Sequence, residues 1–188
     1  MKSFRRLPAT VNAGSMADIA FLLLIFFLVT TTISADKGIN RQLPPVCEGV
    51  DCTTVIADRN LLPIHLNRNH EIMIAGEIYE LDEVKTKLVA FIDNNGVDRC
   101  SYCEGVGAKT SSDHPTKAVI TLRYDALSTY DYVVALQDEI TKAYMDLRTR
   151  YAENVYGKQP YELSKAELKL VQEAYPFKVS EIPVKRSE

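Results

Sequence analysis

An uninterrupted apolar run near the start of the chain limits its possible folds more than any other feature. The stretch Ile19 to Val29 has no polar side chain, and within Ala17 to Ile33 the only ionisable residue is Asp18. Roughly 18 helical residues rise about 27 Å, close to the thickness of a bilayer core. The run predicts one transmembrane helix over residues 17–34, after a short cytoplasmic lead over residues 1–16.

The charges around this helix predict its orientation. Lys2, Arg5 and Arg6 precede it with no acid among them, whereas the charges that follow largely cancel. Because basic residues stay on the cytoplasmic side, we expect a cytoplasmic N-terminus and a periplasmic remainder. The alternative is a cleavable signal peptide, which would be cut near Ile33-Ser34-Ala35. The long lead and an acid at the edge of the apolar run favour a retained anchor.

Asp18 is the residue in this helix that needs an explanation. A charged side chain at the centre of a membrane helix costs roughly 2.5–3.5 kcal/mol. Asp18 therefore either lies at the cytoplasmic interface or sits inside a partner's helical bundle, where it takes and releases protons. Thr32 falls on nearly the same helical face, and with Thr30 it is a candidate pore-lining residue. In the alternative interpretation, both hydroxyls bond back to the helix backbone.

The rest of the chain is predicted to hold a tether and a small mixed α+β domain. Residues 35–60 read as an extended tether and loop, because Pro44 and Pro45 cannot continue a helix. The domain spans residues 61–188 and has an inserted loop at about 94–116, which is rich in Gly and Ser. The apolar periodicity predicts, in order, strands over 62–66 and 71–76, a helix over 81–92, a strand over 117–124, helices over 130–156 and 164–174, and a strand over 177–182.

The segment from Asn12 to Thr30, NAGSMADIAFLLLIFFLVT, resembles the N-terminus of ExbD/TolR proteins, and its lead and the following threonines resemble the Bacteroidetes variant. The resemblance combines a short basic lead, an aspartate at the same place in a single apolar helix, and the LLLIFFLVT run. More loosely, it extends to the tether at 39–45 and to residues 72–92 and 118–143. It implies a single-pass inner-membrane protein with a periplasmic domain, whose tether, with Leu43 and Pro44, binds a partner.

The resemblance also implies a function. Asp18 would be the proton carrier of a motor subunit that uses the proton-motive force. Its partners would be a pentameric ExbB/TolQ-type channel protein, a second copy of this chain in a dimer, and a TonB- or TolA-like energy transducer. The insertions at about 47–60 and 94–116, and the extension after Arg148, leave the outer-membrane client open among TonB, Tol, gliding and secretion roles.

Four cysteines, Cys47, Cys52, Cys100 and Cys103, fall on the predicted periplasmic side, where disulfides form. Pairing within each close pair is the simplest connectivity, and cross-pairing is the alternative. A four-thiolate zinc site is a third interpretation, because the second pair has zinc-knuckle spacing. A redox-active CxxC is disfavoured, since no helix N-terminus follows Cys100.

Other classes of function receive little support from the sequence. A net charge of -3 and a pI near 5.7 argue against a protein that binds nucleic acid. The three histidines, His65, His70 and His114, lie in or beside loops, and no nucleophile, acid pair or metal-ligand spacing accompanies them. We therefore expect them to be surface residues. We also expect that the protein is not an enzyme and binds no cofactor or metal. The runner-up is a membrane-tethered periplasmic binding or scaffold protein without proton coupling, in which Asp18 is incidental.

Overall fold

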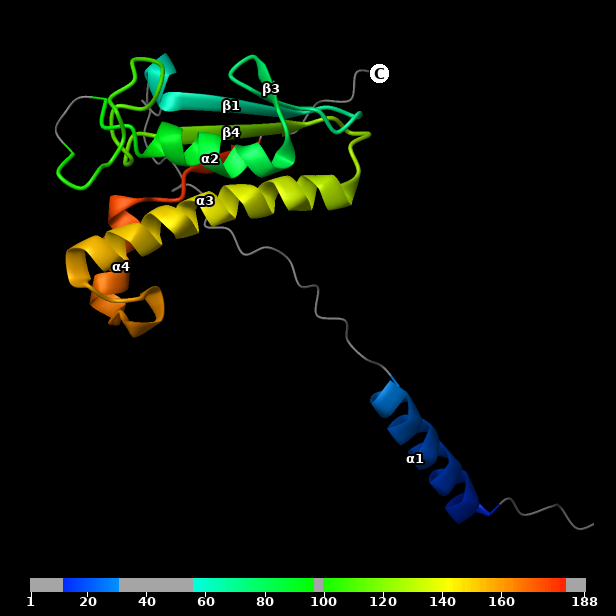
Figure 1. Cartoon of the computed structure of the whole chain (residues 1–188). Coiled ribbons are helices and arrows are strands. Elements are labelled where there is room, and N and C mark those ends of the chain that lie inside the picture. The colour runs from blue at the N-terminus through cyan, green and yellow to red at the C-terminus, as the bar shows by residue number, and fades with distance from the viewer. Residues whose placement is uncertain (1–11, 31–55, 97–99, 182–188) are drawn as a thin grey trace, which may run out of the picture. The chain divides into compact units, whose positions relative to one another are not determined.

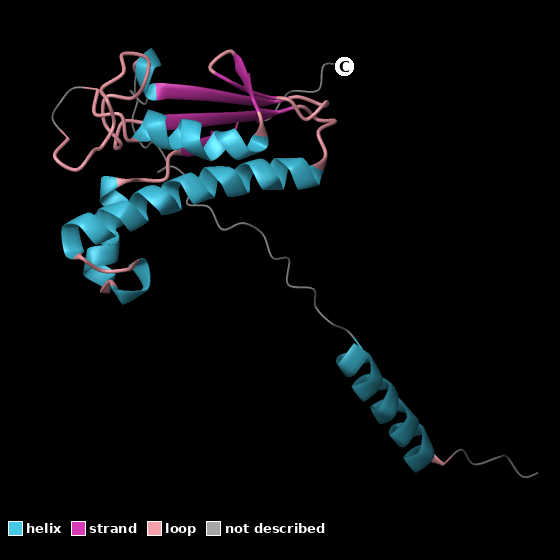
Figure 2. Ribbon diagram, viewed as in Figure 1, coloured by secondary structure: helices cyan, strands magenta, loops and turns pink. Residues whose placement is uncertain are grey.

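The chain divides into two units, Met1–Cys52 and Thr53–Glu188. A computed structural model describes residues 12–30, 56–96 and 100–181. In the first unit it shows one helix, α1 (Ala13–Thr30), and in the second a sheet with helices (Figures 1 and 2). One apolar N-terminal helix followed by a mixed α and β domain confirms the predicted fold class.

The second unit is built on a five-stranded mixed sheet with strand order β3-β2-β1-β4-β5. Its elements are η1 (Asp58–Asn60), β1 (Leu61–Leu66), β2 (Ile72–Ile74), β3 (Glu77–Tyr79), α2 (Leu81–Ile92), β4 (Val119–Tyr124), α3 (Tyr130–Tyr156), η2 (Pro160–Glu162), α4 (Lys165–Ala174) and β5 (Val179–Glu181). The first three strands are antiparallel neighbours, whereas β4 runs parallel to β1 and β5 parallel to β4. Parallel neighbours need long crossover connections, which α2 and then α3 with α4 supply.

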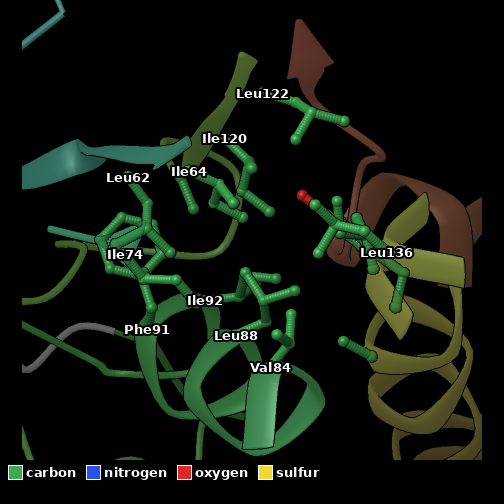
Figure 3. Close-up of a cluster of buried hydrophobic side chains, with 14 of the residues drawn as sticks. Leu62, Ile64, Ile74, Val84, Leu88, Phe91, Ile92, Ile120, Leu122 and Leu136 are labelled. Atoms are coloured by element: carbon green, nitrogen blue, oxygen red, sulfur yellow. The ribbon is translucent and has the colours of Figure 1, made fainter. Parts of the chain in front are cut away.

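Alternation along the strands gives the sheet one buried face. In β1, Leu62, Ile64 and Leu66 are buried, and the residues between them are only half-buried. Ile64 is in register with Ile74 of β2 and with Leu122 of β4. This row of side chains crosses three strands and points toward the helices (Figure 3). Burying each such side chain stabilises the fold by about 1.5–3 kcal/mol.

Helices α2 and α3 cover this face together (Figure 1). Val84, Leu88 and Ile92 of α2 are fully buried, as are Leu136 and Ile140 of α3, so the helical spacing expected for both segments produces one core. α2 begins with a capping box in which Glu80 and Glu83 bond to each other's backbone amides. The bounds of both helices agree with the predicted ones.

Past the sheet, α3 continues and the chain turns back into α4. α3 ends because Gly157 adopts the left-handed conformation, with φ 63°, and its amide donates to the carbonyl of Glu153 at 2.9 Å. α4 starts at the predicted capping box, where the amide of Glu167 donates to Ser164 Oγ and the Glu167 carboxylate accepts from the Ser164 amide.

The short strand β3 is absent from the predicted elements. Ala75 and Gly76, with φ of 51° and 93°, form the turn that returns the chain from β2 to β3. The predicted strand over 71–76 therefore ends at Ile74, and a second short strand follows the turn. The other strands form within the predicted ranges or one residue beyond them.

The described part of the inserted loop is held by buried polar side chains. Asn94 is 1% exposed; its amide donates to the carbonyls of Ala108 and Ser112 at 2.8 and 2.9 Å, and its Oδ1 accepts from the Ala108 amide at 2.7 Å. At the end of the loop, Asp113 exchanges two hydrogen bonds with the buried Asn60. These contacts connect the loop to the end of α2 and to the start of the sheet.

Candidate functional site

The start of α1 is set by Asn12. Its Oδ1 accepts a hydrogen bond from the Gly14 amide at 3.0 Å, and its carbonyl accepts one from the Met16 amide at 3.3 Å. The helix therefore begins at Ala13, inside the segment expected to be the cytoplasmic lead. Over its 18 residues the mean hydropathy is 2.1, so by length and composition it is able to cross a membrane.

Asp18 is the only ionisable residue between Ala13 and Thr30. Since α1 begins at Ala13, Asp18 lies in the second turn of the helix and not at its first residue. Successive helical residues are about 100° apart, so Ile25 and Val29 fall on nearly the same face as Asp18. The carboxyl group thus interrupts an otherwise apolar face, near the end of the helix that we expect to be cytoplasmic.

Of the two threonines predicted to line a pore, the structure describes only Thr30. The hydroxyl of Thr30 donates to the carbonyl of Phe26 at 2.8 Å, which is the backbone bond of the alternative interpretation. Thr32, Leu43 and Pro44 lie outside the described residues. Their roles, and that of Thr30 in lining a pore, stay predictions.

Comparison with known families accounts for the combination of one apolar helix, its single carboxylate and the small domain. The family model of the biopolymer transport protein ExbD/TolR matches residues 5–151. The chain belongs to the ExbD/TolR family. Members of this family are anchored in the inner membrane and take part, without being enzymes, in energising biopolymer transport. No curated protein sequence matches the chain.

The family match covers only part of this ExbD/TolR protein. It includes α1, the strands β1 to β4 and α2, and it ends at residue 151, inside α3. The end of α3, α4 and β5 follow the matched region. β5 nevertheless completes the sheet, because Val179 and Ser180 are in register with Ile120 and Thr121 of β4.

The cysteines of this ExbD/TolR protein are described only in part. Cys100 and Cys103 form a disulfide, with 5.4 Å between their Cα atoms, which is the pairing predicted for these two residues. A disulfide leaves neither sulfur as the thiolate that zinc binds. Cys47 and Cys52 lie outside the described residues, so their predicted pairing stays a prediction. No group of side chains in the described part of the chain has an arrangement that could hold a metal ion.

A partly buried aromatic cluster of Tyr102, Tyr151 and Tyr175 is centred on Tyr102, which lies between the disulfide-bonded cysteines in the sequence, and the sequence patterns give no sign of it. The ring of Tyr102, between the two cysteines, makes edge contacts with the rings of Tyr151 and Tyr175, with centroids 5.1 and 5.5 Å away. The Tyr102 hydroxyl donates to the carbonyl of Ala174 at 3.0 Å. Burial raises the pKa of Tyr102 to about 12. The cluster joins the inserted loop to α3 and to the segment after α4.

The three histidines expected on the surface are all half-buried in the structure. His65 projects from β1 on the side away from the core, and His70 stacks on Tyr132 with ring centroids 4.4 Å apart. The ring of His114 packs against the edge of Tyr102, and burial lowers the pKa of its imidazole. All three are therefore only partly exposed, and for His70 and His114 the cause is packing against the rings of Tyr132 and Tyr102.

Proposed function

We propose that this protein is the proton-carrying subunit of an inner-membrane motor driven by the proton-motive force, in which Asp18 takes up and releases the proton. One observation carries the proposal: a membrane-length helix of a family that energises transport contains a single ionisable side chain. A carboxylate at this depth is costly unless a partner or a function compensates for it. In a surrounding channel the partner helices are that partner, and proton transfer by Asp18 is that function.

The energy available to such a site is sufficient for mechanical work. Moving one elementary charge across a membrane potential yields about 2.3 kcal/mol per 100 mV. A few protons per cycle therefore release an amount comparable with the free energy that holds a small domain folded, about 5–15 kcal/mol. Each proton changes the charge of α1 by one unit, which alters how this helix sits in a low-dielectric environment.

The surface of α1 supports close packing with partner helices. Ala13, Ala17 and Ala20 follow each other at four- and three-residue steps and form a stripe of small side chains beside Asp18. Small residues allow helix backbones to approach closely in a membrane. We propose that α1 packs in this way within an ExbB/TolQ-type channel, beside the helix of a second copy of the chain.

The position of the second unit follows from the same proposal. With Lys2, Arg5 and Arg6 before α1, the N-terminus is cytoplasmic and residues 53–188 lie in the periplasm. There the domain connects the motor to a TonB- or TolA-like transducer, and the tether that includes Leu43 and Pro44 contacts this partner.

Substitution of Asp18 tests the proton-carrying role directly. Asp18→Asn keeps the size and hydrogen-bonding capacity of the side chain but removes its proton, whereas Asp18→Glu keeps an ionisable carboxyl. The measurement is energy-dependent uptake across the outer membrane in cells that carry each variant as their only copy. Immunoblots of membrane fractions and co-purification with the channel protein show whether each variant inserts and assembles.

Loss of uptake in an assembled Asp18→Asn variant, with partial retention in Asp18→Glu, supports proton carriage. Normal uptake with Asp18→Asn contradicts it and favours a membrane-tethered binding or scaffold protein. Ser15→Ala is the matched control on the same helix. It removes a hydroxyl about one turn before Asp18, so it tests whether any polar change in α1 abolishes uptake.

A further inference from the structure

We propose that the Cys100–Cys103 disulfide is a thiol–disulfide exchange site for a dithiol reductant, and that its redox state controls how firmly the C-terminal segment, residues 171–181, is held to the domain. The proposal concerns the periplasmic domain and does not depend on proton transfer by Asp18. It rests on the different exposure of the two cysteine residues and on the contacts of Tyr102, which lies between them in the sequence.

The two cysteines differ in access to solvent. Cys100 is 7% exposed, and its amide is fixed by a hydrogen bond of 3.0 Å to Asn95 Oδ1. Cys103 is half-buried and lines a cavity of about 280 Å³, together with Tyr151 and Asn154 of α3. We therefore expect an incoming thiolate to attack Cys103 through the cavity in preference to Cys100.

The exchange balances with a dithiol as the co-reactant. Its thiolate attacks Sγ of Cys103, the bond between the two protein sulfurs breaks, and Cys100 leaves as a thiolate that takes a proton. The second thiol of the reductant, as its thiolate, then attacks the reductant's first sulfur, which is bonded to Cys103. Cys103 leaves as a thiolate and takes a proton. The products are two protein thiols and one disulfide of the reductant.

The charge beside the cavity regulates the rate of this attack. Glu104 also lines the cavity, and its Oε1 accepts a hydrogen bond from Asn154 at 3.0 Å. A carboxylate that lines the same cavity as the attacked residue repels an incoming thiolate. Exchange is therefore expected to be slow in the native domain and to be faster when this charge is removed.

The consequence of reduction follows from the position of Tyr102. The disulfide closes a short loop around this residue, whose ring contacts Tyr175 and whose hydroxyl bonds to the carbonyl of Ala174. Ala174 ends α4, and the segment after it leads into β5. Opening the disulfide frees the loop from its closed conformation, so Tyr102 contributes less to holding the end of α4 and the edge strand β5.

The first experiment uses the full chain in detergent micelles with Cys47→Ser and Cys52→Ser, so that only one cysteine pair remains. Hydrogen exchange followed by mass spectrometry is compared before and after treatment with dithiothreitol. We expect exchange in residues 171–181 to become at least threefold faster on reduction, while Leu61–Leu66 of β1 stays unchanged. A variant that also carries Cys100→Ser and Cys103→Ser should show the faster exchange with or without the reductant.

The second experiment asks which sulfur is attacked. In the same background, Cys100→Ser leaves only Cys103, and Cys103→Ser leaves only Cys100. We expect Cys103 to react with an aromatic disulfide reagent at least tenfold faster than Cys100. If either single variant fails to fold, Glu104→Gln with the pair intact replaces this experiment, and we expect dithiothreitol to reduce its disulfide severalfold faster, most clearly at low salt.

Two results overturn the proposal. Unchanged exchange in residues 171–181 after complete reduction shows that the disulfide does not hold the C-terminal segment. Equal reactivity of the two cysteines, or an unchanged reduction rate in Glu104→Gln where that variant is used, shows that attack is not directed through the cavity. Tyr102→Phe tests whether Tyr102 connects the disulfide to the C-terminal segment. With the disulfide intact, this variant should show faster hydrogen exchange in residues 171–181, because the bond to Ala174 is lost.

Discussion

The hydroxyl of Tyr175 donates a hydrogen bond of 2.6 Å to Oδ1 of Asp93, and both side chains are buried. Asp93 follows the last residue of α2, and Tyr175 follows the last residue of α4. The second oxygen of Asp93 accepts from the amide of Glu104 in the inserted loop at 3.2 Å. One carboxyl group therefore fastens both the inserted loop and the C-terminal segment to the end of α2.

Removing this hydroxyl should destabilise the domain. Tyr175→Phe leaves a buried carboxylate without its side-chain donor, and hydrogen bonds to charged groups contribute about 1.5–3 kcal/mol. We expect a loss of that size in the free energy of unfolding, measured by urea denaturation of the full chain in micelles. Tyr161→Phe is the control, because Tyr161 is 83% exposed. An equal effect of the two substitutions would contradict the assigned role of the Asp93 bond.

The same carboxyl group should give the stability a pH dependence. Burial raises the pKa of Asp93 above its ordinary 3.8, although the bonds from Tyr175 and Glu104 lower it in part. A group with a raised pKa binds more protons in the folded state, so its stabilising contribution is largest below pH 3.8 and is lost as the pH rises through the folded pKa.

This contribution is measured as a difference between two proteins. We expect the unfolding free energy of wild type minus that of Asp93→Asn to fall as the pH rises from about 4 toward neutrality. The subtraction removes other carboxyls, including Glu167, whose pKa is lowered to about 2 by its bond from Lys158 and whose effect has the opposite sign. A difference that is flat, or that rises with pH, contradicts the raised pKa of Asp93.

Two neighbouring residues of β1 test whether only one face of the sheet is packed against the core. Ile64 is completely buried, whereas His65 points to the other face and is half-buried. Ile64→Ala should cost about 2–5 kcal/mol of stability through lost burial and the cavity left behind. His65→Ala should cost less than about 1 kcal/mol. Urea denaturation of both variants checks this, and similar losses would mean that both faces of the sheet are packed.

The local elements of the domain were predictable because their signals are local. The bounds of α2 and α3 follow from apolar spacing and helix ends, including Gly157 after the last turn of α3. β3 was missed because it has only three residues and none of them is buried, so it gives no apolar alternation to detect. The start of α1 was placed too late, since Asn12 was not recognised as a cap.

The buried polar contacts were not predictable for a different reason. Asp93 and Tyr175 are 82 residues apart, and only the folded chain brings them together. Asp18 is the opposite case. Its position in the apolar helix is evident from the sequence, but under the proposed function the groups that set its proton affinity belong to partner chains. Its assigned role therefore comes from the resemblance to ExbD/TolR proteins, and the family match supports that resemblance.

Asn94 provides a test of how the inserted loop is held. Asn94→Ala removes its two donated bonds to the carbonyls of Ala108 and Ser112 and its accepted bond from Ala108, and buried groups without partners cost about 1–3 kcal/mol. We expect faster hydrogen exchange in residues 105–112 and unchanged exchange in β4, whose Ile120 and Leu122 are fully buried in the core. Lys109→Ala is the control, because this exposed side chain lies in the same loop. If Asn94→Ala speeds exchange throughout the domain, the loop and the core unfold as one cooperative unit, and the buried amide stabilises the whole fold.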